Sequence, residues 1–456
     1  MSVSRLIYAA LGCAFMVLPH TVNAQDKPNY QLGMLPPGHI MLPEGDVQAN
    51  IFLMSDAGGW GDEEEKQAKA LVEKGAAVVG IDFPTYMKAL SADEGDCVYM
   101  ISDIEELAHE IQREAKAQTY RLPILAGVGE GGALALAMIA QSPASTIGEA
   151  IAVDPLAGIP LENRILCTPA TKEKAGNRTI YGLTDGDLPT PVTVLFSIAA
   201  KQEGRDHATA LQTKHPDIDI QDVTGQANDE LLQALSDRVD AAGDTDQPLG
   251  LPLTILDAKP SMDTMAVIYS GDGGWRDIDK EMGGYLEKQG IPVVGVDSLR
   301  YFWSERKPQE ATDDLARIIE TYRHQWGVHH VLLVGYSFGA DILPALYDLL
   351  PEKDKERVAL MSLMALSHQA DYKVSVEGWL GIQGEGSAGD PVDYIKKMDA
   401  SMVQCIYGKD DDENACPALE GSGANVVALE GGHHFDGDYE ALAQRVLTLL
   451  KTRLGK

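Results

Sequence analysis

One segment of this chain occurs twice, and the repeat limits the folds that the chain can adopt. IFLMSDAGGWGDEEEKQAKALVEKGAAVVGIDF begins at Ile51, and AVIYSGDGGWRDIDKEMGGYLEKQGIPVVGVDS begins at Ala266. The Gly-Gly-Trp loop at 58–60 recurs 215 positions later at 273–275, and the strand that ends each copy keeps the same spacing. A constant spacing across loop, helix and strand is hard to obtain by chance, and it is far too long for a solenoid repeat. We therefore expect both halves to share one fold.

Each half follows the same order of predicted elements. An apolar strand leads into a glycine-rich loop and an amphipathic helix, then into a second strand that ends in aspartate, a longer helix, and a strand–turn–helix. Alternating strands and helices favour a parallel sheet covered on both faces. The stretch at 240–252 is polar and contains Gly and Pro, as is typical of a linker. The sequence therefore predicts two tandem α/β domains, at 25–242 and 250–456, joined by a linker at 243–249.

The last strand–turn–helix of each half is where the two copies differ. The second half has VLLVGYSFGADILPALY at 331–347, whereas the first has PILAGVGEGGALALAMI at 123–139. GYSFG fits the nucleophile-elbow pattern G-x-S-x-G, in which the serine occupies a strained turn between a buried strand and a helix. The pattern alone is weak in a glycine-rich chain, but the flanking strand and helix are those it requires. Ser337 is therefore the candidate nucleophile, and Gly129 takes its place in the first half.

A serine nucleophile needs an acid and a histidine base, here expected in the chain order Ser, Asp/Glu, His. KDDD follows the predicted strand VQCIYG, and the residue three positions after its glycine is Asp411; Asp410 and Asp412 are the alternatives. EGGHHFDGDY follows the last strand, and counting back from its phenylalanine selects His434 as the base, with His433 second. A histidine pair also suits a metal, but adjacent histidines rarely both ligate one ion and no further ligand has suitable spacing. We expect neither a metal nor a cofactor.

The transition state of acyl transfer also needs backbone N–H groups that stabilise an oxyanion. One is expected from Phe338, directly after the nucleophile, and another from the loop SGDGGW, at Asp272 or a neighbour. The alternative is that the glycines of this loop only make a tight turn, since the first half keeps the loop without a serine. We further expect Trp275, Tyr336 and Asp341, near the loop and the elbow, to contact the substrate.

The first half lacks this set of residues. Its last predicted strand, within IDIQDVTGQANDELLQAL, has no histidine at the place of His434, and Gly129 replaces the serine. We therefore predict two tandem α/β-hydrolase-like domains, of which the first lacks the catalytic Ser and His. Such a domain is free to serve in binding, packing or regulation.

The first 24 residues have the features of an export signal. Arg5 supplies a positive charge, residues 6–18 are apolar, and VNA precedes the expected cleavage after Ala24. The apolar stretch is too short to span a membrane, and no later segment approaches 18 consecutive apolar residues. We expect the mature chain to be exported and soluble, in the periplasm.

Four cysteines remain once this segment is removed. An even number in an exported protein favours disulfides. Cys405 and Cys416 flank one short loop and are expected to pair, which leaves Cys97 to pair with Cys167. The alternative is that all four are buried free thiols.

The chain is strongly acidic. Its formal net charge is −32 at pH 7, and removal of the single basic residue of the export signal makes it −33. We expect no nucleic acid partner, because phosphates need cationic side chains. The charge permits attraction to a cationic substrate or partner. The alternative is a solvated surface without a specific role, which net charge alone does not distinguish.

The second half resembles the AcvB/VirJ family of bacterial virulence proteins nearly from end to end. The segments that carry the resemblance are SGDGGWRDID, GVDSLRYFWSERKP, LLVGYSFGADILP, GWLG, CIYG with a second cysteine, and GGHHFDGDY. The first half matches the longer, two-domain AcvB-like members more loosely. The resemblance implies a periplasmic protein with an α/β-hydrolase domain and with the family's serine motif at Ser337.

For AcvB-like members the resemblance also implies hydrolysis of lysyl-phosphatidylglycerol, which releases lysine and restores the anionic lipid. The expected partner is therefore an aminoacylated phospholipid at the membrane surface. Because members of the family are linked to type IV secretion, components of that secretion system are further expected partners. A lysine ester carries extra positive charge, which an acidic domain would favour. The aromatic cluster RYFW at 300–303 either lines an acyl or lipid-surface contact or belongs to the core.

The leading hypothesis is a serine esterase with Ser337 as nucleophile, His434 as base and Asp411 orienting the histidine. A hypothesis from another class is a periplasmic interaction protein that supports a secretion complex and keeps a vestigial triad. A third is a general esterase or thioesterase for soluble substrates. Retention of Ser, Asp and His in the second half, after the first half lost Ser and His, favours the esterase.

Overall fold

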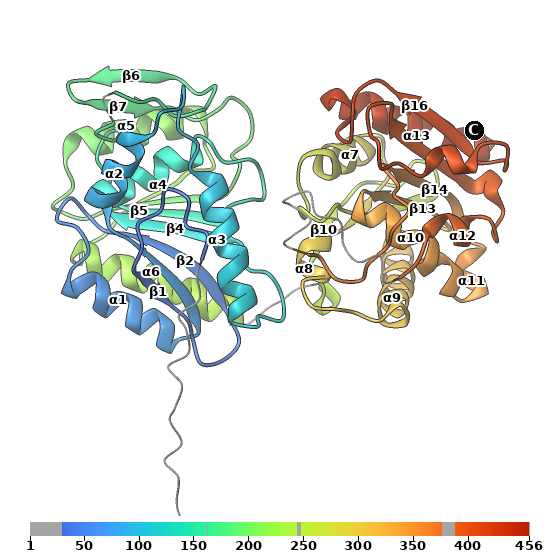
Figure 1. Ribbon diagram of the computed structural model, residues 1–456, viewed down its shortest axis with the longest axis horizontal. Coiled ribbons are helices and arrows are strands. Elements are labelled where there is room, and N and C mark those ends of the chain that lie inside the picture. Colours follow the sequence, from blue (N-terminus) through green and yellow to red (C-terminus); the bar gives the residue numbers. More distant parts are fainter. Residues whose placement is uncertain (1–29, 162, 244–247, 376–387, 456) are drawn as a thin grey trace, which may run out of the picture. The chain divides into compact units, whose positions relative to one another are not determined.

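The computed structural model describes residues 30–161, 163–243, 248–375 and 388–455, and these form two seven-stranded sheets of the same design. In each sheet one edge strand is antiparallel to its neighbour, and the other pairings are parallel. Helices cover both faces of each sheet (Figure 1). The chain therefore has the predicted fold class, two tandem α/β-hydrolase-like domains. The predicted export signal at 1–24 lies outside the described residues.

The first domain contains one main sheet, six helices and a small hairpin within the described residues. From one edge to the other its strands are β1 (His39–Met41), β3 (Ala76–Ile81), β2 (Ala49–Met54), β4 (Pro123–Val128), β5 (Glu149–Val153), β8 (Val192–Phe196) and β9 (Asp219–Asp222). Its helices are α1 (Asp62–Glu73), α2 (Phe83–Ala92), α3 (Ile101–Glu114), α4 (Glu130–Ile139), α5 (Gln202–Lys214) and α6 (Ala227–Gly243). The hairpin consists of β6 (Lys172–Ala175) and β7 (Arg178–Tyr181).

The second domain repeats this strand order. Its strands are β10 (Leu253–Leu256), β12 (Val293–Val296), β11 (Thr264–Tyr269), β13 (His330–Tyr336), β14 (Val358–Met364), β15 (Val403–Gly408) and β16 (Asn425–Leu429). Its helices are α7 (Asp277–Lys288), α8 (Ser298–Tyr301), α9 (Pro308–Trp326), α10 (Phe338–Leu349), α11 (Glu352–Lys355), α12 (Pro391–Ile395) and α13 (Tyr439–Arg453). Short 3-10 turns include η1 (Pro248–Gly250), η4 (Cys416–Leu419) and η5 (Phe435–Gly437). The predicted linker at 243–249 overlaps the end of α6 and the start of η1.

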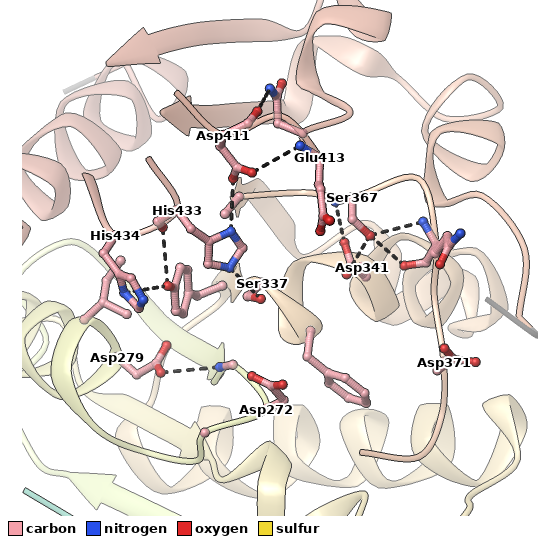
Figure 2. Close-up of a pocket in the computed structure, with 18 of the residues that line it drawn as sticks. Asp272, Asp279, Ser337, Asp341, Ser367, Asp371, Asp411, Glu413, His433 and His434 are labelled. Carbon is pink, nitrogen blue, oxygen red and sulfur yellow. Dashed lines mark hydrogen bonds and ion pairs between the residues drawn. The ribbon is translucent and has the colours of Figure 1, made fainter. Parts of the chain in front are cut away.

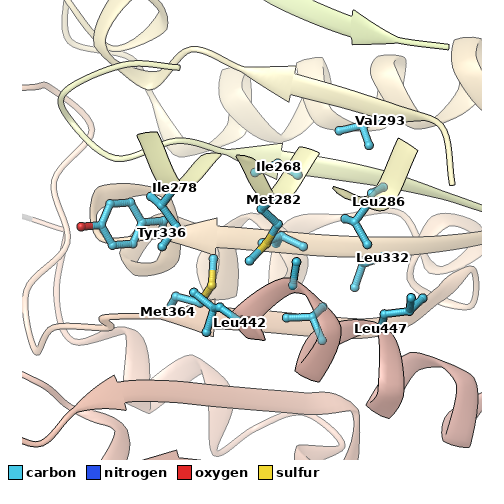
Figure 3. Packing of buried hydrophobic residues seen from close by; sticks show 14 of the residues in the cluster. Ile268, Ile278, Met282, Leu286, Val293, Leu332, Tyr336, Met364, Leu442 and Leu447 are labelled. Carbon is cyan, nitrogen blue, oxygen red and sulfur yellow. The ribbon is translucent and has the colours of Figure 1, made fainter. Parts of the chain in front are cut away.

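One core of the second domain lies between its sheet and helices α7 and α13 (Figure 3). Ile278, Met282 and Leu286 of α7 are spaced by four residues, so they share one helix face, and each is at most 1% exposed. Burial of each such side chain contributes roughly 1.5–3 kcal/mol. Leu442 and Leu447 of α13 complete this layer (Figure 3). The first domain has the corresponding core against α1 and α6. These layers hold the carboxyl ends of the strands, where the candidate site lies.

The aromatic cluster at 300–303 belongs to the core. Tyr301, Phe302 and Trp303 are at most 2% exposed, so the alternative of an acyl or lipid-surface contact does not hold for these rings. Residues 31–456 form a single compact unit, and within it Trp303 packs against Tyr120 of the first domain at a ring-centroid distance of 5.0 Å. The guanidinium carbon of Arg113 lies 3.5 Å from the centroid of the Trp303 ring. In the described ranges, no helix is both long and apolar enough to span a membrane.

Both expected disulfides are present. Cys97 and Cys167 join segments 70 positions apart in the first domain. Cys405 in β15 joins Cys416 in η4, only 11 positions later, and both cysteines are fully buried. The second bridge therefore ties the loop that follows β15 back to that strand.

Replacement of each cysteine pair by alanine should have different consequences. Loss of Cys97–Cys167 releases a long loop in the unfolded chain and should lower the free energy of unfolding by about 4 kcal/mol. Loss of Cys405–Cys416 should cost about 3 kcal/mol by the same argument, but it should also free the loop at 409–415. A glutamate-specific protease should then cleave after Glu413 at least about ten times faster. Urea unfolding and timed proteolysis measure the two effects. Equal Glu413 cleavage rates in the two variants would contradict the assigned role of the second bridge.

Candidate active site

Ser337 sits on a strained turn between β13 and α10. Its backbone has φ 50° and ψ −118°, in the region of positive φ that side chains other than glycine rarely adopt. Glycine is required on both flanks, because a Cβ on Gly335 would lie 2.5 Å from the carbonyl oxygen of Gly339, and one on Gly339 would lie 2.2 Å from that of Tyr269. The turn therefore holds the Ser337 hydroxyl at the carboxyl end of the sheet, as the elbow pattern predicts.

A chain of hydrogen bonds runs from Ser337 through a histidine to an aspartate (Figure 2). Nε2 of His433 lies 2.9 Å from Oγ of Ser337. Nδ1 of His433 lies 3.0 Å from Oδ2 of Asp411, whose side chain is only 8% exposed. The aspartate thus orients the imidazole so that its other nitrogen faces the hydroxyl. This geometry allows His433 to accept the Ser337 proton.

Two loops pack backbone to backbone and bring Asp411 beside His433. A Cβ on Gly408 would lie 2.1 Å from the carbonyl oxygen of Gly432, so only glycine fits where the loops meet. The N–H of Asp410 donates to the carbonyl of Gly431 over 3.0 Å, and the N–H of Asp411 donates to the carbonyl of Gly408 over 3.1 Å. The two alternatives, Asp410 and Asp412, have exposed side chains. The favoured candidate, Asp411, is the one that contacts the imidazole.

The structure contradicts the choice of His434 as base. The ring of His434 points away from Ser337, and its Nδ1 lies 3.0 Å from the hydroxyl of Tyr336. Burial lowers the pKa of His434, as does the neighbouring His433. Counting back from Phe435 failed because Phe435 is buried in η5 with φ 51°, which turns the chain after the two histidines. The histidine two residues before the phenylalanine, His433, therefore faces the serine.

The residues expected to supply oxyanion donors line the same cavity. Phe338 follows the nucleophile directly and is the first residue of α10, so its N–H has no acceptor within the helix. In the glycine-rich loop, the N–H groups of Asp272 and Gly273 favour the charged form of the Asp272 carboxyl group, but they do not outweigh the effect of burial. Burial raises the pKa of Asp272. A neutral carboxyl group there would not repel an oxyanion, whereas a carboxylate would.

The three expected substrate contacts have different surroundings. Trp275 does not line the cavity but packs in the core, where a Cβ on Gly295 would lie 2.3 Å from its ring. Its role is thus to anchor the glycine-rich loop, which corrects the prediction. Tyr336 lines the cavity and contacts His434. Asp341 also lines it, but its carboxyl group accepts hydrogen bonds from the N–H of Ser367 at 2.7 Å and from its hydroxyl at 3.0 Å. Burial raises the pKa of Asp341 well above its usual range.

The cavity above Ser337 has a volume of about 790 Å³ and is strongly acidic. Of the described residues that line it, eight carry carboxyl groups, three are histidines, and two are arginine or lysine. The acidic ones are Asp272, Asp277, Asp279, Asp341, Asp371, Asp411, Asp412 and Glu413, and the arginine and lysine are Arg276 and Lys373. Among the described residues, no group of three or more His, Cys, Asp or Glu could hold a metal ion. Asp371 and Glu413 were not predicted from the sequence. The acidic run after β15 was the available signal for Glu413, but it was used only to select the catalytic aspartate.

The corresponding turn of the first domain keeps its backbone conformation, but the Asp56 side chain occupies the space beside it. Gly129 has φ 56° and ψ −112°, close to the values of Ser337. The N–H of Glu130, the counterpart of the Phe338 N–H, donates to Oδ1 of Asp56 over 2.8 Å. A Cβ on Gly129 would lie 2.5 Å from that same Asp56 oxygen. Arg178 covers the turn through two contacts of 2.7 Å to the Glu130 carboxylate. This domain therefore holds a carboxylate where an esterase would hold its oxyanion.

Several solved structures are similar to part of this chain. Est1E from Butyrivibrio proteoclasticus is 12% identical, with a TM-score of 0.35, over 45% of this chain and 93% of its own. A lipase-esterase related protein from Clostridium acetobutylicum is 16% identical, with a TM-score of 0.32, over 43% of this chain and 99% of its own. The α/β hydrolase GrgF from Penicillium sp. sh18 is 12% identical, with a TM-score of 0.34, over 45% of this chain and 100% of its own. The fold assignment itself rests on the strand order.

No curated protein matches the sequence. The model of the VirJ family, described as bacterial virulence protein, matches residues 263–454. This range covers β11 to α13, and so includes the elbow, the acid loop and the histidine loop. The match confirms the family resemblance drawn from the sequence over residues 263–454, where the chain is similar to the VirJ family of bacterial virulence proteins.

Proposed function

We propose that this protein is a periplasmic serine esterase that hydrolyses the aminoacyl ester of lysyl-phosphatidylglycerol, releasing lysine and phosphatidylglycerol. The observation that carries the proposal is the hydrogen-bonded chain of Ser337, His433 and Asp411 on a nucleophile elbow. Similarity of residues 263–454 to a bacterial virulence family, together with the two disulfides, supports an exported protein.

The proposed reaction follows from the positions of these groups. Oγ of Ser337 attacks the ester carbonyl carbon while Nε2 of His433 takes its proton, and the Phe338 N–H stabilises the oxyanion. The ester C–O bond then breaks, and His433 returns the proton to the glycerol oxygen of the departing phosphatidylglycerol. Water, deprotonated by His433, attacks the lysyl-serine ester in the same way and frees lysine. Asp411 keeps the imidazole oriented in both steps.

The cavity supports a cationic substrate. A lysyl ester carries ammonium groups at its α and ε positions, and the lining residues include eight carboxyl groups but only one arginine and one lysine. Asp412 and Glu413 are exposed, line the cavity and follow the catalytic aspartate directly, so their side chains are accessible to a charged headgroup. Phosphatidylglycerol, the product, lacks the ammonium groups and would be held less strongly. This difference favours product release.

The alternative of an interaction protein with a vestigial triad is supported less well. The first domain shows what happens to the site when its chemistry is lost, because Asp56 fills the turn there. In the second domain the turn opens into a large cavity, and the three side chains retain hydrogen-bonding distances. A protein that used this domain only as a scaffold would not need an open cavity beside an oriented histidine.

Ser337→Ala should abolish the reaction. Loss of the nucleophile should lower the release of free lysine from vesicles containing lysyl-phosphatidylglycerol by at least about 10⁴-fold. The purified chain and the variant should show the same thermal transition, since the hydroxyl is not part of the core. Lysine release by the variant at the rate of the unaltered chain would disprove the assigned nucleophile, and release by neither would favour the interaction protein.

The two adjacent histidines provide a matched pair. His433→Ala should lower kcat for lysine release by at least about 10³-fold, because it removes the base. His434→Ala removes only the contact to Tyr336 and should lower kcat less than about tenfold. Initial rates at saturating lipid measure both. The opposite order of effects would return the base to His434 and show that the loop rearranges on substrate binding.

Added salt should slow the reaction because it weakens substrate binding. Raising ionic strength from about 0.05 to 0.5 M shortens the range of electrostatic attraction, so kcat/KM for the lysyl lipid should fall at least about fivefold. A neutral soluble ester cleaved by the same serine serves as control, and its kcat/KM should change less than about twofold. If both substrates lose activity equally, the acidic cavity does not select the cation.

A further inference from the structure

The residue after the Gly-Gly-Trp loop differs between the two domains. Position 61 is glycine in the first domain, whereas the equivalent residue of the second domain is Arg276. Nη1 of Arg276 lies 2.9 Å from Oε1 of Glu105 in α3 and 3.1 Å from Oγ1 of Thr146, which precedes β5. Both partners belong to the first domain. The loop of the catalytic domain is thus held by side chains of the domain without a nucleophile.

The two domains fix this loop by different means. In the first domain Nε1 of Trp60 donates to Oε2 of Glu65 over 3.2 Å, so the loop is tied to its own helix α1. At the position equivalent to Glu65 the second domain has Lys280, which cannot accept such a bond. The second domain therefore cannot form the same tie. Its loop is held by the bond from the Gly271 N–H to Asp279 of its own helix α7, at 3.4 Å, and by the contact of Arg276 with Glu105.

The ion pair is largely removed from water. The side chains of Arg276 and Glu105 are 20% and 15% exposed. Burial raises the pKa of Glu105, and the Arg276 charge opposes this effect. A buried pair contributes little net stability, but loss of one partner leaves an uncompensated charge, so the partner that remains must move or take up water. The position of the loop is therefore sensitive to Glu105.

Arg276 borders the candidate site directly. Its guanidinium group packs on the loop, because a Cβ on Gly273 would lie 2.6 Å from Nη2 of Arg276. Gly273, Arg276 and Asp272 all line the catalytic cavity. Trp275 anchors the loop in the core of the second domain, and the pair with Glu105 supplies a second anchor.

We propose that Glu105 is a positioning residue. Through it the first domain holds the glycine-rich loop SGDGGW of the second domain, residues 270–275, in the arrangement that stabilises the oxyanion. The inference rests on the proposed esterase function, since it assigns the loop a part in stabilising the oxyanion. It gives the degenerate domain a role in the reaction without requiring a substrate site of its own. Neither Glu105 nor Thr146 touches the reacting atoms.

The test compares Glu105→Gln with Glu106→Gln, the neighbouring residue on α3. Two rates are measured in the full chain: lysine release from lysyl-phosphatidylglycerol vesicles, and covalent labelling of Ser337 by a fluorophosphonate. The fluorophosphonate forms a tetrahedral adduct whose oxygen needs the same stabilisation but whose reaction requires no lipid. Glu105→Gln should slow labelling at least about tenfold and lower kcat similarly with little change in KM, whereas Glu106→Gln should change both rates less than about twofold.

A purely structural role predicts another pattern. If Glu105→Gln lowers the melting temperature but leaves labelling and kcat unchanged, the pair only joins the domains and the proposal is overturned. Glu105→Asp, which keeps the carboxylate, should restore part of the labelling rate. If Glu105→Gln does not fold, Thr146→Val removes the second contact to Arg276 and should slow labelling about threefold. Slower labelling in a chain that does not cleave the lysyl lipid would support the positioning role and disprove only the substrate.

Discussion

The positive φ at the end of the central strand is the constraint on which the active site depends. Such a conformation costs about 1–3 kcal/mol for a residue with a side chain, and it persists because Gly335 and Gly339 let strand, turn and helix approach closely. Gly129 adopts the same turn in the first domain at little cost, since glycine tolerates positive φ. The turn therefore belongs to the fold, and the serine is an addition whose strain the fold can bear.

The two domains share one fold but differ in the side chains at the turn, so comparing them shows which features belong to the fold and which to the chemistry. In the first, the helix N-terminus after the turn is satisfied by the Asp56 side chain of the same domain. In the second, Gly271 stands where the first domain has Asp56, and the turn opens into a cavity with an oriented histidine. Loss of the nucleophile thus coincides with occupation of its anion site. A single Gly129→Ser change would not restore the site, because the new side chain would meet the Asp56 carboxylate.

The sequence was sufficient for the fold and for part of the site. The repeat predicted both sheets, and fixed distances from strand ends identified Ser337 and Asp411 as candidates, because a parallel sheet places those ends together. The histidine was misplaced because η5 turns the chain at Phe435, and a positive φ at a non-glycine residue has no signature in composition. The contact between Glu105 and Arg276 joins residues 171 positions apart in different domains, so no spacing rule within one domain reports it.

The net charge of −32 overstates how much of the molecule can attract a cation. Burial raises the pKa of Asp272, Asp279 and Asp341, so these cavity carboxyl groups resist ionisation and contribute less than their number implies. Asp411 is committed to the histidine. The attraction must therefore come mainly from exposed residues at the cavity such as Asp412 and Glu413. Selectivity for a lysyl headgroup would then depend on a few carboxylates beside the catalytic aspartate, and the remaining acidic surface would act on the encounter at long range.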